Sequence, residues 1–156
     1  MSITEPILQQ VREMSPDELQ QRFTDEIEKR AVDDKYIDGN EERELLQIAL
    51  QHGFPTDWAR NFLVEVCRKR GYAIEAAIVQ LVRERLRSAT LSDGRIDWRG
   101  FKSVVAEAKL AVAGTSKTES EVRKLVVTTM EDTGLNRVKT GWLGNWYRKL
   151  KRDVGA

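Results

Sequence analysis

Apolar side chains recur every three or four residues along most of this 156-residue chain, and no proline after Pro55 interrupts the pattern. Such a recurrence places apolar side chains on one face of an α-helix. The clearest example consists of Leu19, Phe23, Ile27 and Ala31. A β-prone run over residues 125–129 lies inside another segment with helical spacing. The sequence therefore predicts an all-α protein.

Local signals mark where the helices begin. A Ser, Thr or Asp followed three residues later by Glu forms a capping box at a helix start. Three such pairs lie where a stretch of helical spacing begins: Ser15 with Glu18, Asp38 with Glu41, and Thr118 with Glu121. A last helix is expected over residues 140–152. We predict a compact bundle of about eight helices in a single domain, 1–156, with a possible subdivision into 1–90 and 91–156.

The composition argues against an enzyme or a membrane-spanning protein. No stretch approaches the roughly 18 apolar residues of a transmembrane segment, and the N-terminus has no basic-then-apolar signal, so we expect a cytoplasmic protein. The single cysteine, Cys67, lies in an apolar helical stripe, where burial is expected. The single histidine, His52, has no nucleophile or ligand pattern around it. We therefore expect no cofactor and no catalytic residues.

The charges are unevenly distributed. Residues 1–57 contain 14 acidic and 6 basic side chains, whereas residues 58–156 contain 11 acidic and 20 basic ones, and the net charge is +1. Two interpretations are open: the two halves attract each other within one folded chain, which we favour, or they form two faces for different partners.

Two segments of the chain match each other. Both read Asp-x-x-Ile-Asp followed by a helix, one from Asp34 to Asp38 and the other from Asp93 to Asp97. The pattern resembles the second half of an EF-hand loop, in which a Glu at the twelfth position binds calcium. Only the first copy has a Glu there, Glu41, and neither copy has carboxylates at the first and third positions. Neither loop therefore supplies the six or more oxygens that calcium requires, and the resemblance is to a degenerate EF-hand-like helix pair.

The first copy, together with the helix after it, also resembles the TerB-like helical family of tellurite-resistance proteins. The matching residues are Ile37, Asp38, Glu41, Glu42, Leu45, Leu46 and Ala49. The resemblance implies an intracellular all-α module, in some cases linked to stress or chaperone systems, without a catalytic residue set. Asp34, Asp38 and Glu41 are then weak candidates for metal ligands. We favour a simpler role for these acids, which is to stabilise a helix N-terminus.

The C-terminal segment contains the strongest candidate for a binding surface, because aromatic and basic residues are concentrated there. The candidate partner-binding residues are Trp142, Trp146, Tyr147, Arg148, Lys149, Lys151 and Arg152. On a helix, Trp142 and Trp146 would share a face. Three interpretations are open: the rings pack inward as core, they anchor a protein partner, or they contact nucleic acid or an anionic membrane together with the basic residues.

Three functions follow from these patterns. The leading hypothesis is a non-enzymatic protein–protein interaction module, such as an adaptor, regulator or accessory factor. The alternative is an accessory protein that binds nucleic acid through the basic C-terminal half. The third, implied only by the resemblance, is a metal-responsive TerB-like stress protein.

Overall fold

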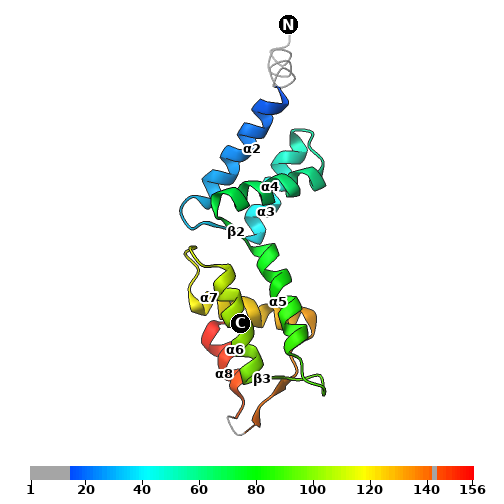
Figure 1. Cartoon of the computed structure of the whole chain (residues 1–156), viewed down its shortest axis with the longest axis vertical. Coiled ribbons are helices and arrows are strands. Elements are labelled where there is room, and N and C mark those ends of the chain that lie inside the picture. Colours follow the sequence, from blue (N-terminus) through cyan, green and yellow to red (C-terminus); the bar gives the residue numbers. More distant parts are fainter. Residues whose placement is uncertain (1–14, 142–143) are drawn as a thin grey trace.

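The computed structural model describes residues 15–141 and 144–156 and consists mainly of helices (Figure 1). Helices account for 70% of it, so the all-α prediction is confirmed. The described residues form seven helices rather than about eight. Residues 3–11, where Ile3, Ile7, Leu8 and Val11 also recur with helical spacing, lie outside the described residues.

The helices form two lobes, joined where α5 leaves the first of them (Figure 1). Lobe 1 (residues 15–74) contains α2 (Pro16–Ala31), β1 (Tyr36–Ile37), α3 (Gly39–Gln51), α4 (Thr56–Arg70) and β2 (Ala73–Ile74). Lobe 2 (residues 75–156) contains α5 (Glu75–Ala89), β3 (Ile96–Asp97), α6 (Trp98–Ala111), α7 (Glu119–Thr133), β4 (Val138–Lys139) and α8 (Trp146–Val154).

Each lobe has its own hydrophobic core. The core of lobe 1 is built from α2, α3 and α4 around Ile27, Leu45 and Leu63, which are almost completely buried. The core of lobe 2 is built from α5 to α8 and includes Phe101 and Met130. Since α5 packs against α6 and α7, the two cores meet near residue 74, ahead of the boundary at residue 90 suggested by the sequence.

A pair of two-residue strands separates the cores. β1 and β2 pair in parallel, with Tyr36 opposite Ala73 and Ile37 opposite Ile74. Side chains alternate across a strand, so each residue faces a different lobe from its neighbour. Ile37 and Ile74 belong to the core of lobe 1, whereas the side chain of Tyr36 enters the core of lobe 2. The two paired strands therefore lie between the cores and contribute side chains to both of them.

All three predicted capping boxes are present. Ser15, Asp38 and Thr118 each accept a hydrogen bond from the backbone N–H three residues later, and the Glu at that position accepts one from the backbone N–H of the cap. Each cap satisfies donors that would otherwise lack a partner at a helix start. The helix boundaries in this part of the fold are therefore locally encoded.

The two Asp-x-x-Ile-Asp segments form the same turn. Asp34 and Asp93 each accept a hydrogen bond from the backbone N–H two residues later, at 3.1 and 3.0 Å. Asp38 and Asp97 cap the following helices, at 2.8 and 2.7 Å. The two segments do not pair with each other, because β1 pairs with β2 and β3 pairs with β4. The sequence repeat is therefore a repeat of local structure at equivalent places in the two lobes.

One position distinguishes the two turns. The residue after the first Asp has a left-handed backbone in both, with φ of +59° at Lys35 and +79° at Gly94. A side chain is disfavoured in that conformation by about 1–2 kcal/mol. We expect Lys35→Gly to raise the free energy of unfolding by about 0.5–1 kcal/mol, after the entropy that glycine gains in the unfolded chain is subtracted. Gly94→Ala should lower it by about 1–2 kcal/mol. Urea denaturation followed by circular dichroism measures both, and a loss of stability in Lys35→Gly would contradict the expectation.

The C-terminal helix begins later than the sequence suggests. Residues 138–139 form β4, which pairs in parallel with β3, and α8 starts at Trp146 instead of near residue 140. Gly141 and Gly144 have positive φ values of 53° and 71°, which a right-handed helix excludes.

No helix in the described part of the chain is long and apolar enough to cross a membrane.

Candidate functional site

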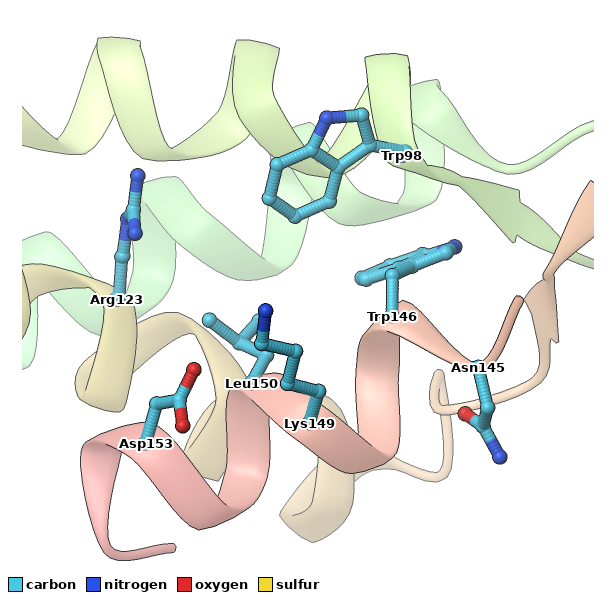
Figure 2. Close-up of a pocket in the computed structure, with 7 residues that line it drawn as sticks. All are labelled: Trp98, Arg123, Asn145, Trp146, Lys149, Leu150 and Asp153. Carbon is cyan, nitrogen blue, oxygen red and sulfur yellow. The ribbon is translucent and has the colours of Figure 1, made fainter. Parts of the chain in front are cut away.

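A pocket of about 520 Å³ lies where α8 meets α6 and α7 (Figure 2). Its lining residues are Trp98, Arg123, Asn145, Trp146, Lys149, Leu150 and Asp153. The volume is within the range of pockets that bind small molecules or side chains of a partner. The pocket is thus the first candidate for a binding site on this molecule.

Aromatic rings form the apolar wall of the pocket. The rings of Trp98 and Trp146 meet edge to face at 5.2 Å between centroids, and both contact Phe101 on α6, at 5.6 and 5.4 Å. Trp146 is only 8% exposed, and its indole N–H donates a hydrogen bond to the backbone oxygen of Lys139 at 3.1 Å. Asn145 caps α8 by accepting a hydrogen bond from a backbone N–H of its first turn. The cap and the buried ring together hold α8 in place.

Basic side chains surround this wall. The ammonium group of Lys149 points into the space between Trp98 and Arg123 (Figure 2). Arg123 is half-buried and forms an ion pair with Glu119 at 3.5 Å. The ammonium group of Lys102 lies 5.8 Å from the centroid of the Trp98 ring. Asp153 is the one acidic residue that lines this pocket, so the site combines a large apolar surface with an excess of basic over acidic side chains.

A second depression extends the pocket along α6. It has a volume of about 200 Å³ and shares Arg123 with the pocket. Its lining residues are Phe101, Lys102, Val105, Ala106, Lys109, Glu119 and Arg123. We call the two together the α6–α8 groove. From Trp98 to Lys109, which follows it by 11 positions, the groove runs along α6 for about 16 Å.

The C-terminal residues singled out by the sequence point in different directions. Trp146 and Lys149 line the groove. Tyr147 is 8% exposed and faces α7, where its hydroxyl donates a hydrogen bond to Glu131 at 2.6 Å. Lys151 forms an ion pair with the same carboxylate at 2.9 Å. Arg148 and Arg152 are exposed to solvent, and Trp142 lies outside the described residues.

Glu131 is therefore the acceptor that fixes α8 to α7. Hydrogen bonds from Tyr147, Lys151 and Asn136 stabilise its charged form and lower its pKa to about 2. Because the pKa is lower in the folded state, Glu131 contributes stability above its unfolded pKa, and this contribution is lost as the pH falls towards 2. We expect Glu131→Gln to lower the free energy of unfolding by about 1 kcal/mol near pH 7. This difference from the wild type should shrink as the pH falls below about 4.5. Urea denaturation at a series of pH values tests this, and a difference independent of pH would contradict it.

Most residues of the groove were not among the binding residues predicted from the sequence, and Trp98 and Arg123 are two of them. Trp98 begins α6 directly after the capping Asp97, and Arg123 lies on α7. The only signal for Trp98 was its place at the start of the second repeat helix. Arg123 carried no signal, because its position beside α8 depends on how α7 and α8 pack.

The acidic residues considered as metal ligands accept hydrogen bonds from nearby backbone groups instead. Asp38 and Glu41 form the capping box of α3, and Asp34 accepts a hydrogen bond within its turn. Burial raises the pKa of Glu41, which disfavours the charged form that a metal needs. No group of three or more Asp, Glu, His and Cys side chains in the described ranges is placed to hold a metal ion. Cys67 is buried, as expected, and burial raises its pKa to about 12.

The comparisons with known proteins give no relative. No family model, no curated protein and no solved structure matches this chain. The site must therefore be interpreted from its own residues.

Proposed function

We propose that this protein is a cytoplasmic, non-enzymatic protein–protein interaction module that binds an acidic, amphipathic segment of its partner in the α6–α8 groove. The observation that carries the proposal is the wall of Trp98 and Trp146 beside Lys149, Arg123 and Lys102. Tryptophan and arginine are enriched among the residues that dominate binding energy at protein interfaces.

The shape of the groove supports a helical partner. A groove between helices, with an apolar floor about 16 Å long, accommodates the apolar face of an amphipathic helix. Phe101, Val105 and Leu150 belong to the floor, and Lys102, Lys109 and Lys149 lie along its rim. Acidic groups on the partner would meet these amines, whereas basic groups would be repelled.

Two labelled peptides test the proposal. The acidic peptide, about 16 residues long, carries apolar residues with helical spacing and Glu elsewhere, and the basic peptide has Lys in place of every Glu. In fluorescence anisotropy the acidic peptide should bind at least about tenfold more tightly than the basic one. A Lys102→Glu/Lys149→Glu variant should lose this preference, because it reverses two exposed charges of the rim.

The control variant is Arg83→Glu/Arg87→Glu, which makes the same change in net charge on exposed positions of α5, outside the groove. It should retain the preference for the acidic peptide. Equal binding of both peptides by the wild type would contradict the proposal. So would stronger binding of a labelled single-stranded DNA with a steep salt dependence, which would instead support a nucleic-acid-binding protein.

A further inference from the structure

The opposite charges of the two lobes are not neutralised within one molecule. Residues 15–74 contain 13 acidic and 9 basic side chains, and residues 75–156 contain 10 and 16. Of the ion pairs among the described residues, six lie inside lobe 1 and five inside lobe 2, and none joins the lobes. The attraction between residues 1–57 and 58–156 that the sequence suggested appears in two ion pairs, Arg60 with Glu42 and Arg70 with Glu28, but both lie inside lobe 1, so no ion pair of the described residues acts between the lobes.

The elongated shape explains why. The N-terminal half of α2 and the helices α6 and α8 lie toward opposite ends of the molecule (Figure 1). The 15 residues of α5 alone extend about 22 Å. This exceeds the Debye length of about 8 Å at physiological ionic strength, so the two ends interact weakly within one molecule. Close contact between two molecules would remove that separation.

Lobe 1 presents a helix face with more acidic than basic side chains on α2, toward the end of the lobe away from lobe 2 (Figure 1). The exposed acidic residues of α2 are Asp17, Glu18 and Asp25, which share one helix face with Gln21, and the exposed basic residues Arg22 and Lys29 border this face. The same face continues to Val32, which is 52% exposed and provides an apolar contact. We call this set the α2 ridge. The exposed charged residues of α4, in contrast, are mainly basic, with Arg60, Arg68, Lys69 and Arg70 against Asp57 and Glu65, and a basic groove would repel this excess of positive charge.

We propose that the α6–α8 groove of one molecule receives the α2 ridge of a second copy, so that the protein associates head to tail. The inference rests on the proposed function, because it uses the same groove, and it names the chain itself as one partner. Asp17 and Asp25 of the ridge face Lys102 and Lys149 of the groove.

The contact has a consequence for the kind of assembly. Ridge and groove lie on different lobes, so the interface is heterologous, and each added molecule leaves one free ridge and one free groove. Association therefore produces open chains rather than a closed dimer. A net charge of only +1 does little to oppose this association.

Sedimentation velocity of the full chain tests the inference. At about 0.01 M ionic strength, where the Debye length is about 30 Å, the mean sedimentation coefficient should rise with protein concentration. At about 0.15 M it should fall towards the monomer value. Lys102→Glu/Lys149→Glu and Asp17→Lys/Asp25→Lys should each weaken association about tenfold. The charge-matched control Arg83→Glu/Arg87→Glu should associate like the wild type.

Mixing the two charge-reversed variants gives the sharpest result. Neither associates well alone, but the basic groove of one variant again meets an acidic ridge on the other, so the equimolar mixture should associate. Far-UV circular dichroism shows that each variant is folded. A wild type that stays monomeric at low ionic strength overturns the inference, and so does a mixture no larger than its components. If the acidic peptide still binds in the groove while the wild type stays monomeric, only the self-association is wrong and the proposed function stands.

Discussion

Replacing Trp146 with alanine should lower the free energy of unfolding by about 3–5 kcal/mol. The indole is 8% exposed and contacts the rings of Trp98 and Phe101, so its removal leaves a cavity between α6 and α8. The variant also loses the hydrogen bond to the backbone oxygen of Lys139, at 3.1 Å, which ties α8 to β4. Urea denaturation followed by far-UV circular dichroism measures the loss independently of tryptophan fluorescence.

The control for this variant is Trp146→Phe, which keeps an aromatic ring in the same contact but removes the indole N–H. Its free energy of unfolding should fall by less than that of the alanine variant, because part of the ring contact is retained and the lost hydrogen bond contributes about 1 kcal/mol. A loss below about 1 kcal/mol in Trp146→Ala would show that α8 is not fixed to α6 by this ring.

Replacing Tyr36 with alanine should also lower the free energy of unfolding by about 3–5 kcal/mol, for a different reason. Tyr36 lies on a strand of lobe 1, but its ring is 2% exposed and belongs to the core of lobe 2. The ammonium group of Lys117 lies 4.3 Å from the ring centroid, and the backbone N–H of Ser116 donates a hydrogen bond to the backbone oxygen of Asp34 at 3.0 Å. Burial beside Glu75 raises the pKa of the Tyr36 hydroxyl.

The form of the unfolding transition distinguishes this variant from an ordinary core truncation. Because Tyr36 links the two cores, its loss should allow one lobe to unfold before the other, and a single transition should separate into two. Tyr36→Phe, which keeps the ring, should retain a single transition. Lys117→Ala should cost about 1 kcal/mol or less. A single transition of unchanged midpoint in Tyr36→Ala would show that the lobes are not coupled through this ring.

The expected effect of Trp146→Ala changes how binding should be tested. A ring that stabilises the fold cannot be removed without disturbing the groove, so a loss of binding in that variant would not identify a contact with the partner. Lys102 and Lys149 are exposed, and reversing their charge changes the rim without opening the core. They are therefore the informative positions for both proposals.

Local signals predicted much of the helical structure. The capping boxes at Ser15, Asp38 and Thr118 are all formed. The stop at Gly71, where φ is +72°, was also predictable, because glycine adopts that conformation readily. These features depend on residues within four positions of one another, so the sequence contains the information needed to place them.

The four short strands were not predicted. Two residues are too few for an alternating pattern, and each strand pairs with a segment far away in the chain, as Ile37 does with Ile74. The start of α8 was misplaced for a related reason, because residues 138–139 are held by β3, about 40 residues earlier in the chain. Long-range pairing leaves no local mark in the sequence.

The candidate site was only partly visible in the sequence. Its aromatic and basic composition near the C-terminus pointed to Trp146 and Lys149, which do line the groove. The sequence could not show that Tyr147 and Lys151 face Glu131 instead, or that Trp98 and Arg123 complete the site. The assignment of faces on α8 depends on which helices surround it, and those contacts form only in the folded chain.

The sequence by itself determined the helical class, the starts of α2, α3 and α7 and the opposite charges of the two halves, because periodicity, capping and ionisation are properties of a residue and its close neighbours. Only the tertiary structure decided that β1 and β2 lie between two cores and that the ring of Tyr36, from a strand of lobe 1, packs in the core of lobe 2. It also decided that α8 packs against α6 to form a groove. These features arise from burial of apolar surface between segments distant in the chain, and many pairings of similar helices satisfy the same pattern until packing selects one of them.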